Sequence, residues 1–277
     1  MNLKKIATTF IFLFLSLVAL CARDLSNAEQ QAIDDFMLFR VKITTIKDFH
    51  KALKTINEYQ EQNKSLITSF SDEAQLIINN FIVLEQYNYI YNININDSNL
   101  QDLILSQNSK NDKWFDAHNK NTINKWLYCT AADIKSCCLQ FVSKTDAMKI
   151  GLSIKDYYKT ALKLDKNMSY ALFGLGQWLI QAPAIAGGNK NDAIETFKLA
   201  VNSSRNNAET FYGYIFLSQA YFTKKETSKA SNMLTKALSI EPQSNYIAFI
   251  KILNESNYSL YYYVTHREKI DKKLNLS

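Results

Sequence analysis

The sequence has little glycine and little proline. It holds 6 glycines and 2 prolines among 277 residues, whereas average usage of about 12% for the two types together would give roughly 30. Sheet proteins and α/β proteins need these residues for hairpin turns, bulges and βα loops. Their scarcity excludes such folds and predicts a mainly helical protein. A content of 47% hydrophobic and 21% charged residues is too apolar for a disordered chain.

The sequence also lacks the motifs that most enzymes carry. It has no G-x-S-x-G, no H-E-x-x-H, no phosphate-binding loop and no C-x-x-C. The three histidines, His50, His118 and His266, are far apart and share no metal-ligand spacing. We therefore predict a protein that is not an enzyme and that uses no metal ion or cofactor.

The positive charge is modest and scattered. Two of the cations behind the formal net charge of +6, Lys4 and Lys5, stand in the first five residues. The remainder forms no arginine-rich stripe of the kind that phosphate backbones require. Nucleic acid is therefore excluded as a partner.

Residues 1–22 have the features of an export signal. Lys4 and Lys5 precede an uncharged, largely apolar run over residues 6–20, which is short for a membrane-spanning helix. Residues 18–21 resemble the lipobox of bacterial lipoproteins, in which Cys21 would be acylated, although Leu20 replaces the usual small residue. Ordinary cleavage after Cys21 or Ala22 is the alternative. We expect a periplasmic or exported protein that touches a membrane only through a possible lipid anchor.

Three cysteines remain after either cleavage: Cys129, Cys137 and Cys138. Export permits disulfides, but three thiols allow at most one internal pair. The other interpretation is that they are small, buried apolar residues.

An internal repeat organises the second half of the chain. Alanines at positions 161, 200 and 237 close three similar amphipathic segments, at spacings of 39 and 37 residues. Periods of this size indicate stacked supersecondary units. Residues 211–242 carry the matches to the tetratricopeptide repeat (TPR) pattern, which are Tyr214, Leu217, Ser218, Tyr221, Ala230, Leu234, Ala237 and Pro242. The segment thus resembles the TPR family, in which each unit is a pair of helices that cross at small residues.

The preceding unit, which starts at Ser169, has an enlarged turn. Gly176 and Ala193 are 17 positions apart, against 12 for the equivalent Ser218 and Ala230, so five extra residues lie between the helices. They include Pro183, Gly187 and Gly188. We expect Pro183 to end the first helix and Asn191 to cap the second. The turn is either a docking loop or a simple connection, and the flanking sequence lacks the strand and lysine of a phosphate site. Such turns loosely resemble those of TPR partner proteins of periplasmic TRAP-type transporters.

The resemblance implies the fold class and the division of the chain. We expect an all-α, right-handed solenoid of TPR-like hairpins, with diverged helices in residues 23–135, repeats in 136–243, and a capping helix and basic tail in 244–277. A capping box, Ser26 with Glu29, opens the first helix.

In TPR proteins the second, fifth, ninth and twelfth residues of each unit line the concave face. The residues at these positions here are Tyr170, Phe173, Gln177, Ile180, Tyr212, Ile215, Gln219 and Phe222. These aromatic, aliphatic and amide side chains suit an apolar helix, a peptide or an apolar small molecule. The alternative is that the chain's own helices fill the groove.

Taken together, the resemblance implies a periplasmic interaction scaffold or adaptor with a protein partner, in its most specific form the solute-binding protein of a transporter. A structural factor in envelope assembly and a carrier of an apolar ligand are the alternatives. The protein could also associate with itself.

Overall fold

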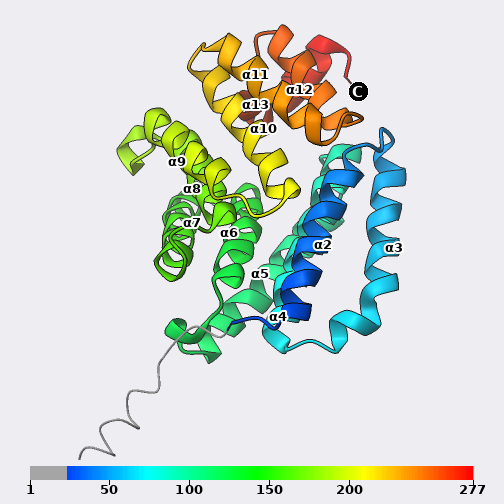
Figure 1. The fold of residues 1–277 in the computed structure, drawn as a ribbon, viewed down its shortest axis with the longest axis vertical. Helices are drawn as coiled ribbons and strands as arrows, with labels where there is room; N and C mark the ends of the chain where they lie inside the picture. The colour runs from blue at the N-terminus through cyan, green and yellow to red at the C-terminus, as the bar shows by residue number, and fades with distance from the viewer. Residues whose placement is uncertain (1–23, 277) are drawn as a thin grey trace, which may run out of the picture.

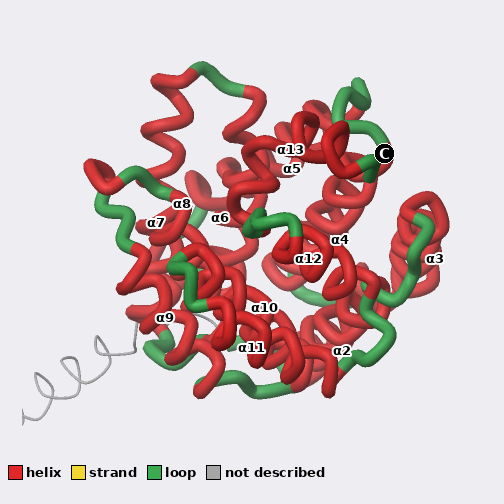
Figure 2. The backbone as a smooth tube through the Cα atoms, turned by 90° about the horizontal axis from the view of Figure 1, so that it is seen from above, coloured by secondary structure: helices red, strands yellow, loops and turns green. Residues whose placement is uncertain are grey.

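The computed structural model describes residues 24–276, and helices form nearly all of this part of the chain (Figures 1 and 2). The predicted export signal and Cys21 lie outside the described residues. The α-helices are α2 (Asn27–Ile43), α3 (Phe49–Thr68), α4 (Asp72–Ile93), α5 (Asn99–Ala117), α6 (Lys125–Cys138), α7 (Lys144–Leu164), α8 (Ser169–Gln181), α9 (Lys190–Asn202), α10 (Asn207–Thr223), α11 (Thr227–Ile240), α12 (Asn245–Glu255) and α13 (Leu260–Leu274). Three 3-10 turns accompany them, η1 (Lys120–Thr122), η2 (Leu139–Phe141) and η3 (Ala184–Ala186).

Short polar side chains start most of these helices. The side chain of Ser26 accepts from the backbone of Glu29 and the Glu29 carboxylate accepts from the backbone of Ser26, which confirms the predicted capping box. At the start of α4 the side chain of Ser71 accepts a hydrogen bond from the backbone N–H of Ala74. At the start of α10 the side chain of Asn206 accepts one from the backbone N–H of Glu209. Each cap satisfies an N–H group that the first turn of a helix leaves free.

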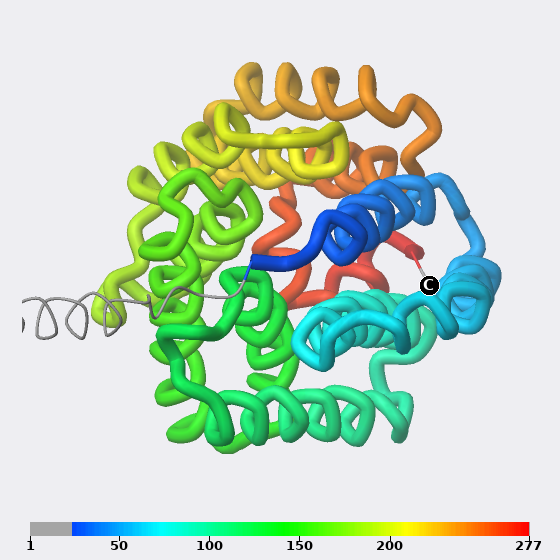
Figure 3. Tube along the Cα trace, turned by 60° about the horizontal axis from the view of Figure 1, so that its bottom comes forward, coloured from blue at the N-terminus to red at the C-terminus, as the bar shows by residue number. Residues whose placement is uncertain are grey.

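The even-numbered helices from α2 to α10 form an inner ring. In chain order α2 contacts α4, α4 contacts α6, α6 contacts α8 and α8 contacts α10, and α10 then returns to contact α2. The odd-numbered helices α3, α7, α9 and α11 pair with these as the partners of helical hairpins. Figure 3 shows the resulting superhelix wound into a nearly closed ring. The predicted all-α solenoid of hairpins is therefore confirmed.

The last two helices differ from the single capping helix expected after Pro242. Residues 245–274 form α12 and α13, joined at Asn257 with a positive φ of 63°. The backbone N–H of Asn245 donates to Thr44 O at 2.8 Å, so α12 is tied to the end of α2. α13 is bent at His266 and lies inside the ring (Figure 3).

The predicted helix crossings are confirmed in the repeat region. A Cβ added at Gly176 would lie 2.6 Å from a ring carbon of Phe197, so α8 and α9 approach this closely only because position 176 has no side chain. Ser218, Ala230 and Ala237 are fully or almost fully buried at the equivalent places in α10 and α11. The first helix of the preceding hairpin is α6, which ends at Cys138. The division expected at residue 136 therefore falls inside this helix.

Candidate interaction surface

The predicted concave-face residues are mostly covered in the structure. Tyr170, Phe173 and Ile180 of α8 are buried, and Ile215 and Gln219 of α10 are fully buried. The remaining three, Gln177, Tyr212 and Phe222, keep part of their surface exposed. The eight residues belong to two helices, α8 and α10, and five of them are buried against the rest of the chain.

Polar side chains of the diverged helices cover this face. Arg40 of α2 sits over the ring of Tyr212, with its guanidinium carbon 5.2 Å from the ring centroid. The same guanidinium donates through Nε to Glu85 of α4 at 2.6 Å. On α6, the Asp133 carboxylate accepts hydrogen bonds from Tyr158 at 2.5 Å and from Tyr170 at 2.6 Å. The inner face is thus held by charged side chains that bridge helices distant in sequence.

Burial and hydrogen bonding act in opposite directions on Asp133. Burial raises the pKa of its carboxyl, while the two tyrosine hydroxyls and the Arg40 charge lower it, and burial has the larger effect. The repeat pattern gave no signal for Arg40, Glu85 or Asp133, because their partners lie 25 or more residues away in sequence.

The C-terminal segment completes the cover. The Gln219 side-chain oxygen accepts from the backbone N–H of Leu260 at 2.8 Å, which satisfies a free donor in the first turn of α13. Further along α13, Arg267 donates to the carbonyl oxygens of Tyr91 at 2.8 Å and Asn92 at 3.1 Å, at the end of α4. The chain therefore fills its own groove, which is the alternative that the sequence left open.

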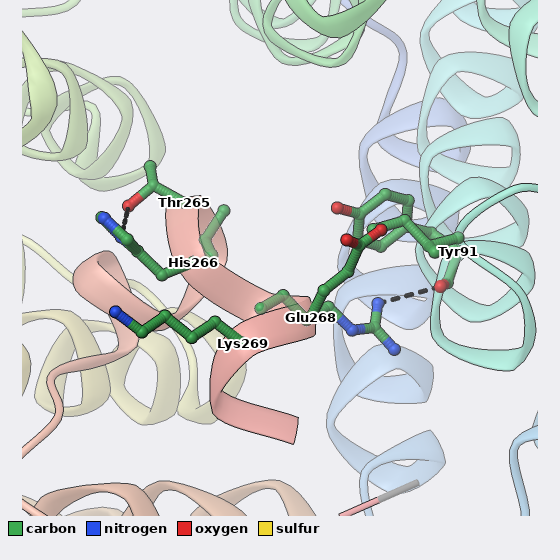
Figure 4. A pocket seen from close by; sticks show the side chains of 8 residues that line it. Tyr91, Thr265, His266, Glu268 and Lys269 are labelled. Atoms are coloured by element: carbon green, nitrogen blue, oxygen red, sulfur yellow. Dashed lines mark hydrogen bonds between the residues drawn. The ribbon is translucent and has the colours of Figure 1, made fainter. Parts of the chain in front are cut away.

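A cavity of about 280 Å³ lies beside this contact of α13 with α4 (Figure 4). Tyr91 and Glu268 stand on one side of the view, and His266 and Lys269 extend on the other. The His266 ring stacks on Tyr262 at 4.0 Å between centroids. The charged side chains around the cavity point in different directions, so they form no converging set of groups that would fix a ligand.

The enlarged turn between α8 and α9 is an ordered structure. Gly187 has φ 93°, which favours glycine, and an added Cβ at Gly188 would lie 1.8 Å from Ala182 O. The Asn189 N–H donates to Leu179 O at 2.8 Å. Pro183 follows the last residue of α8 by two positions, as expected for a helix stop. The expected cap at Asn191 is wrong: Asn189 caps α9, accepting from the backbone of Asn191 at 2.9 Å.

The turn carries an exposed apolar side chain at its tip. Ile185 is 98% exposed. The neighbouring stretch of α7 is tied to this corner, because Trp178 donates to Gly151 O at 2.7 Å and the Lys155 ammonium lies over the Trp178 ring at 4.2 Å. That stretch adds two more exposed apolar residues, Met148 and Leu152. We call Met148, Leu152 and Ile185 together the turn surface.

Other chemistry is sparse in the described part of the chain. Residues 24–276 contain no group of three or more His, Cys, Asp or Glu side chains arranged to hold a metal ion. Within the same range, no helix combines the length and apolarity needed to cross a membrane. Cys129, Cys137 and Cys138 are free thiols, and burial raises the pKa of Cys129 and of Cys137.

Comparison with known proteins gives similar structures but no family assignment. No protein-family model and no curated protein matches the chain. One similar solved structure is TTC0263, described as a thermophilic TPR protein in Thermus thermophilus, with a TM-score of 0.46, 11% identity, and coverage of 80% of this chain and 94% of that one. Another is YrrB, described as a TPR protein with an unusual peptide-binding site, with a TM-score of 0.38, 16% identity, and coverage of 80% and 96%. Similarity at this level does not transfer a function.

Proposed function

We propose that this protein is an exported, non-enzymatic scaffold that docks a partner protein on the turn surface. The observation that carries the proposal is the fully exposed Ile185 at the tip of a turn whose backbone is fixed. A large aliphatic side chain has no folding role when it contacts only solvent. Burying it against a partner would release water from apolar surface, a gain of about 1.5–3 kcal/mol for a residue of this size.

The rigidity of the turn supports the same proposal. Three backbone hydrogen bonds close it, from Ala186 to Pro183, Gly187 to Ala184 and Gly188 to Pro183, at 2.9 to 3.1 Å. A loop held in one conformation loses little conformational freedom when it binds, so more of the contact energy remains as affinity. A simple connection between two helices needs neither the added length nor this ordering.

The finer proposal concerns location and partner. The export-type N-terminus supports a periplasmic or envelope location, and the loose resemblance to partner proteins of TRAP-type transporters supports a solute-binding protein as partner. The alternative partner, a component of envelope assembly, would use the same surface.

Site-specific photo-crosslinking on the full-length protein tests this function. A photoreactive residue at position 185 is compared with one at Leu199, an exposed leucine near the other end of α9 that is 57% exposed. We expect position 185, and not position 199, to capture one defined envelope protein, and Ile185→Asp with Met148→Asp to abolish its co-purification. A transporter component identifies the first partner class and an assembly factor the second. Equal capture from both positions would contradict docking at the turn surface.

A further inference from the structure

The Lys155 ammonium lies at the corner of the molecule that carries the turn surface. In this corner α8 packs against α7 on one side and α9 on the other (Figure 1). From α7, Lys155 extends over the Trp178 ring of α8, with Nζ 4.2 Å from the ring centroid. The ammonium reaches the enlarged turn, because an added Cβ at Gly187 would lie 3.1 Å from Lys155 Nζ. It is therefore a neighbour of the turn surface, since Leu152 precedes Lys155 by one helical turn and Ile185 is two residues before Gly187.

The position of this ammonium is restricted. The Trp178 ring beneath it is itself held in place, because its indole N–H donates to Gly151 O at 2.7 Å. The face of an indole attracts a cation, and the Lys155 side chain is only partly exposed. The charge is therefore held at one place on the surface.

Lys155 forms no ion pair and no side-chain hydrogen bond with any of residues 24–276. Other cations that lie over aromatic rings in this range have an acidic partner. Lys135, over a tyrosine ring, pairs with Asp112 at 2.6 Å. Lys229, over another tyrosine ring, pairs with Glu226. Lys155 has the ring without the carboxylate.

A second lysine shows why the missing carboxylate matters at this place. Lys236 lies over the Tyr214 ring at 5.6 Å and also has no carboxylate partner among the described residues, but it is exposed and water solvates it. Lys155 is partly covered, and the attraction between charges is screened less where water is excluded. A carboxylate supplied by another molecule would form a charge-assisted hydrogen bond with the Lys155 ammonium.

The other charges of the corner favour a single carboxylate over an anionic surface. In residues 144–156 and 182–192 the remaining charged side chains are all exposed, three of each sign: Lys144, Lys149, Lys190, Asp146, Asp156 and Asp192. Anionic bilayers attract clusters of about four to eight lysines or arginines. This corner instead offers one positioned ammonium among mixed charges and exposed apolar side chains.

We propose that the partner segment on the turn surface presents an aspartate or glutamate carboxylate to the Lys155 ammonium. Apolar side chains beside that carboxylate cover Leu152 and Ile185. The inference rests on the docking function proposed above and adds the chemistry of the partner. The charge selects among partners, because an apolar segment without the acid would bury the ammonium unpaired.

Glycine labelling gives a local readout, since the chain has six glycines. In the full-length protein labelled with ¹⁵N-glycine, the amide signals of Gly187 and Gly188 report on the turn, and those of Gly174 and Gly213 are internal controls. The probes are N-acetyl-Leu-Glu-Leu-amide and its Gln analogue. We expect a saturable shift of the two turn signals with the Glu peptide and at least about tenfold weaker binding of the Gln peptide. Absence of a saturable shift, or equal binding of the two peptides, would overturn the proposal.

Three variants locate the interaction. Lys155→Met keeps an unbranched side chain over Trp178 without the charge, so it should abolish the preference for the Glu peptide. Lys155→Arg keeps the charge and should retain the preference. Lys236→Met removes the other unpaired cation above a ring and should change nothing. A preference that survives in Lys155→Met, or that is lost equally in Lys236→Met, would refute the role of Lys155.

Two results separate this inference from the docking function and from a membrane. If photo-crosslinking at position 185 captures the same partner from the parent and from Lys155→Met with equal yield, docking stands and the inference fails. If position 185 captures nothing, the docking function fails, while the peptide titration still decides the chemistry of the site. Phosphatidylglycerol vesicles that perturb the Gly187 and Gly188 signals, when phosphatidylcholine vesicles and the Glu peptide do not, would assign the surface to a membrane and overturn the proposal.

Discussion

The two halves of the molecule hold their helices together by different means. In α8 to α11 the helices meet at residues without bulk, such as Gly176, Ser218 and Ala230, so that backbones approach closely. In α2 to α6 an apolar core of larger side chains is joined by buried polar side chains that bond between helices. Asn80 of α4, for example, donates to Asn111 of α5 at 2.9 Å and to Thr130 of α6 at 3.0 Å. A crossing made by small residues leaves a pattern in the sequence, whereas a polar network does not.

The largest effect that would test this contrast is overpacking of a small-residue crossing. Gly176→Leu places a four-carbon side chain where a single Cβ already lies 2.6 Å from the Phe197 ring. We expect a loss of at least about 3 kcal/mol of unfolding free energy, with α8 and α9 forced apart. Chemical denaturation followed by circular dichroism measures it.

Gly151→Ala is the matched control, because nothing lies within 4 Å of an added Cβ at that helical glycine. It should stabilise the protein by about 0.5–1 kcal/mol. Equal stabilities for Gly176→Leu and the parent would show that the crossing has room to spare.

The second prediction concerns the polar network of the first half. Asn80→Ala removes the partner of the Asn111 and Thr130 oxygens and of the Gln107 amide, which donates to Asn80 at 2.7 Å. We expect a loss of about 2–3 kcal/mol, because buried polar groups are left unpaired. Hydrogen exchange should accelerate in α4, α5 and α6 and change little in α9 and α11. Uniform acceleration across the chain would mean that the halves unfold as one unit.

These contrasts explain what the sequence could and could not predict. Spacing alone identified the hairpins in residues 169–240, the crossing at Gly176 and the capping box at Ser26, since each rests on residues close together in the chain. The cover of the inner face depended on pairs such as Arg40 with Glu85, 45 residues apart. No local pattern links them, so the sequence could not decide whether the groove is open or filled by the chain's own helices.

The candidate site divides in the same way. The enlarged turn was visible as five extra residues, although its cap, Asn189, was not.

A smaller effect should appear in acid. Burial alone would raise the pKa of Glu29, but hydrogen bonds from the Ser71 hydroxyl and from the Ser26 and Ser71 backbones outweigh it and lower the pKa from 4.5 to about 2. A carboxyl with a lowered folded pKa stabilises the protein above pH 4.5, and this contribution is lost as the pH falls towards 2. Allowing for solvent screening, we expect about 1–2 kcal/mol.

Glu29→Gln isolates that contribution. Parent and variant should differ most near neutral pH and converge as the pH falls from 4.5 to about 2, in thermal melts recorded across the range. A constant difference at all pH values would mean that the pKa of Glu29 is the same in the folded and in the unfolded chain.

The smallest expected effect on stability is that of shortening the enlarged turn. Deleting residues 183–187 brings the connection between α8 and α9 close to the length of the α10–α11 connection and keeps the Asn189 cap. Closing a loop of different length changes the free energy by only a few tenths of a kcal/mol, and Ile185 buries nothing. The melting temperature should therefore stay within a few degrees of the parent, while co-purification of a partner docked on the turn surface is lost and that partner is retained by Phe222→Ala. If the deletion unfolds the protein, the hydrogen bond from Asn189 to Leu179 O is a structural requirement of the hairpin. If neither stability nor any complex changes, the turn is a tolerated insertion and docking must use another surface.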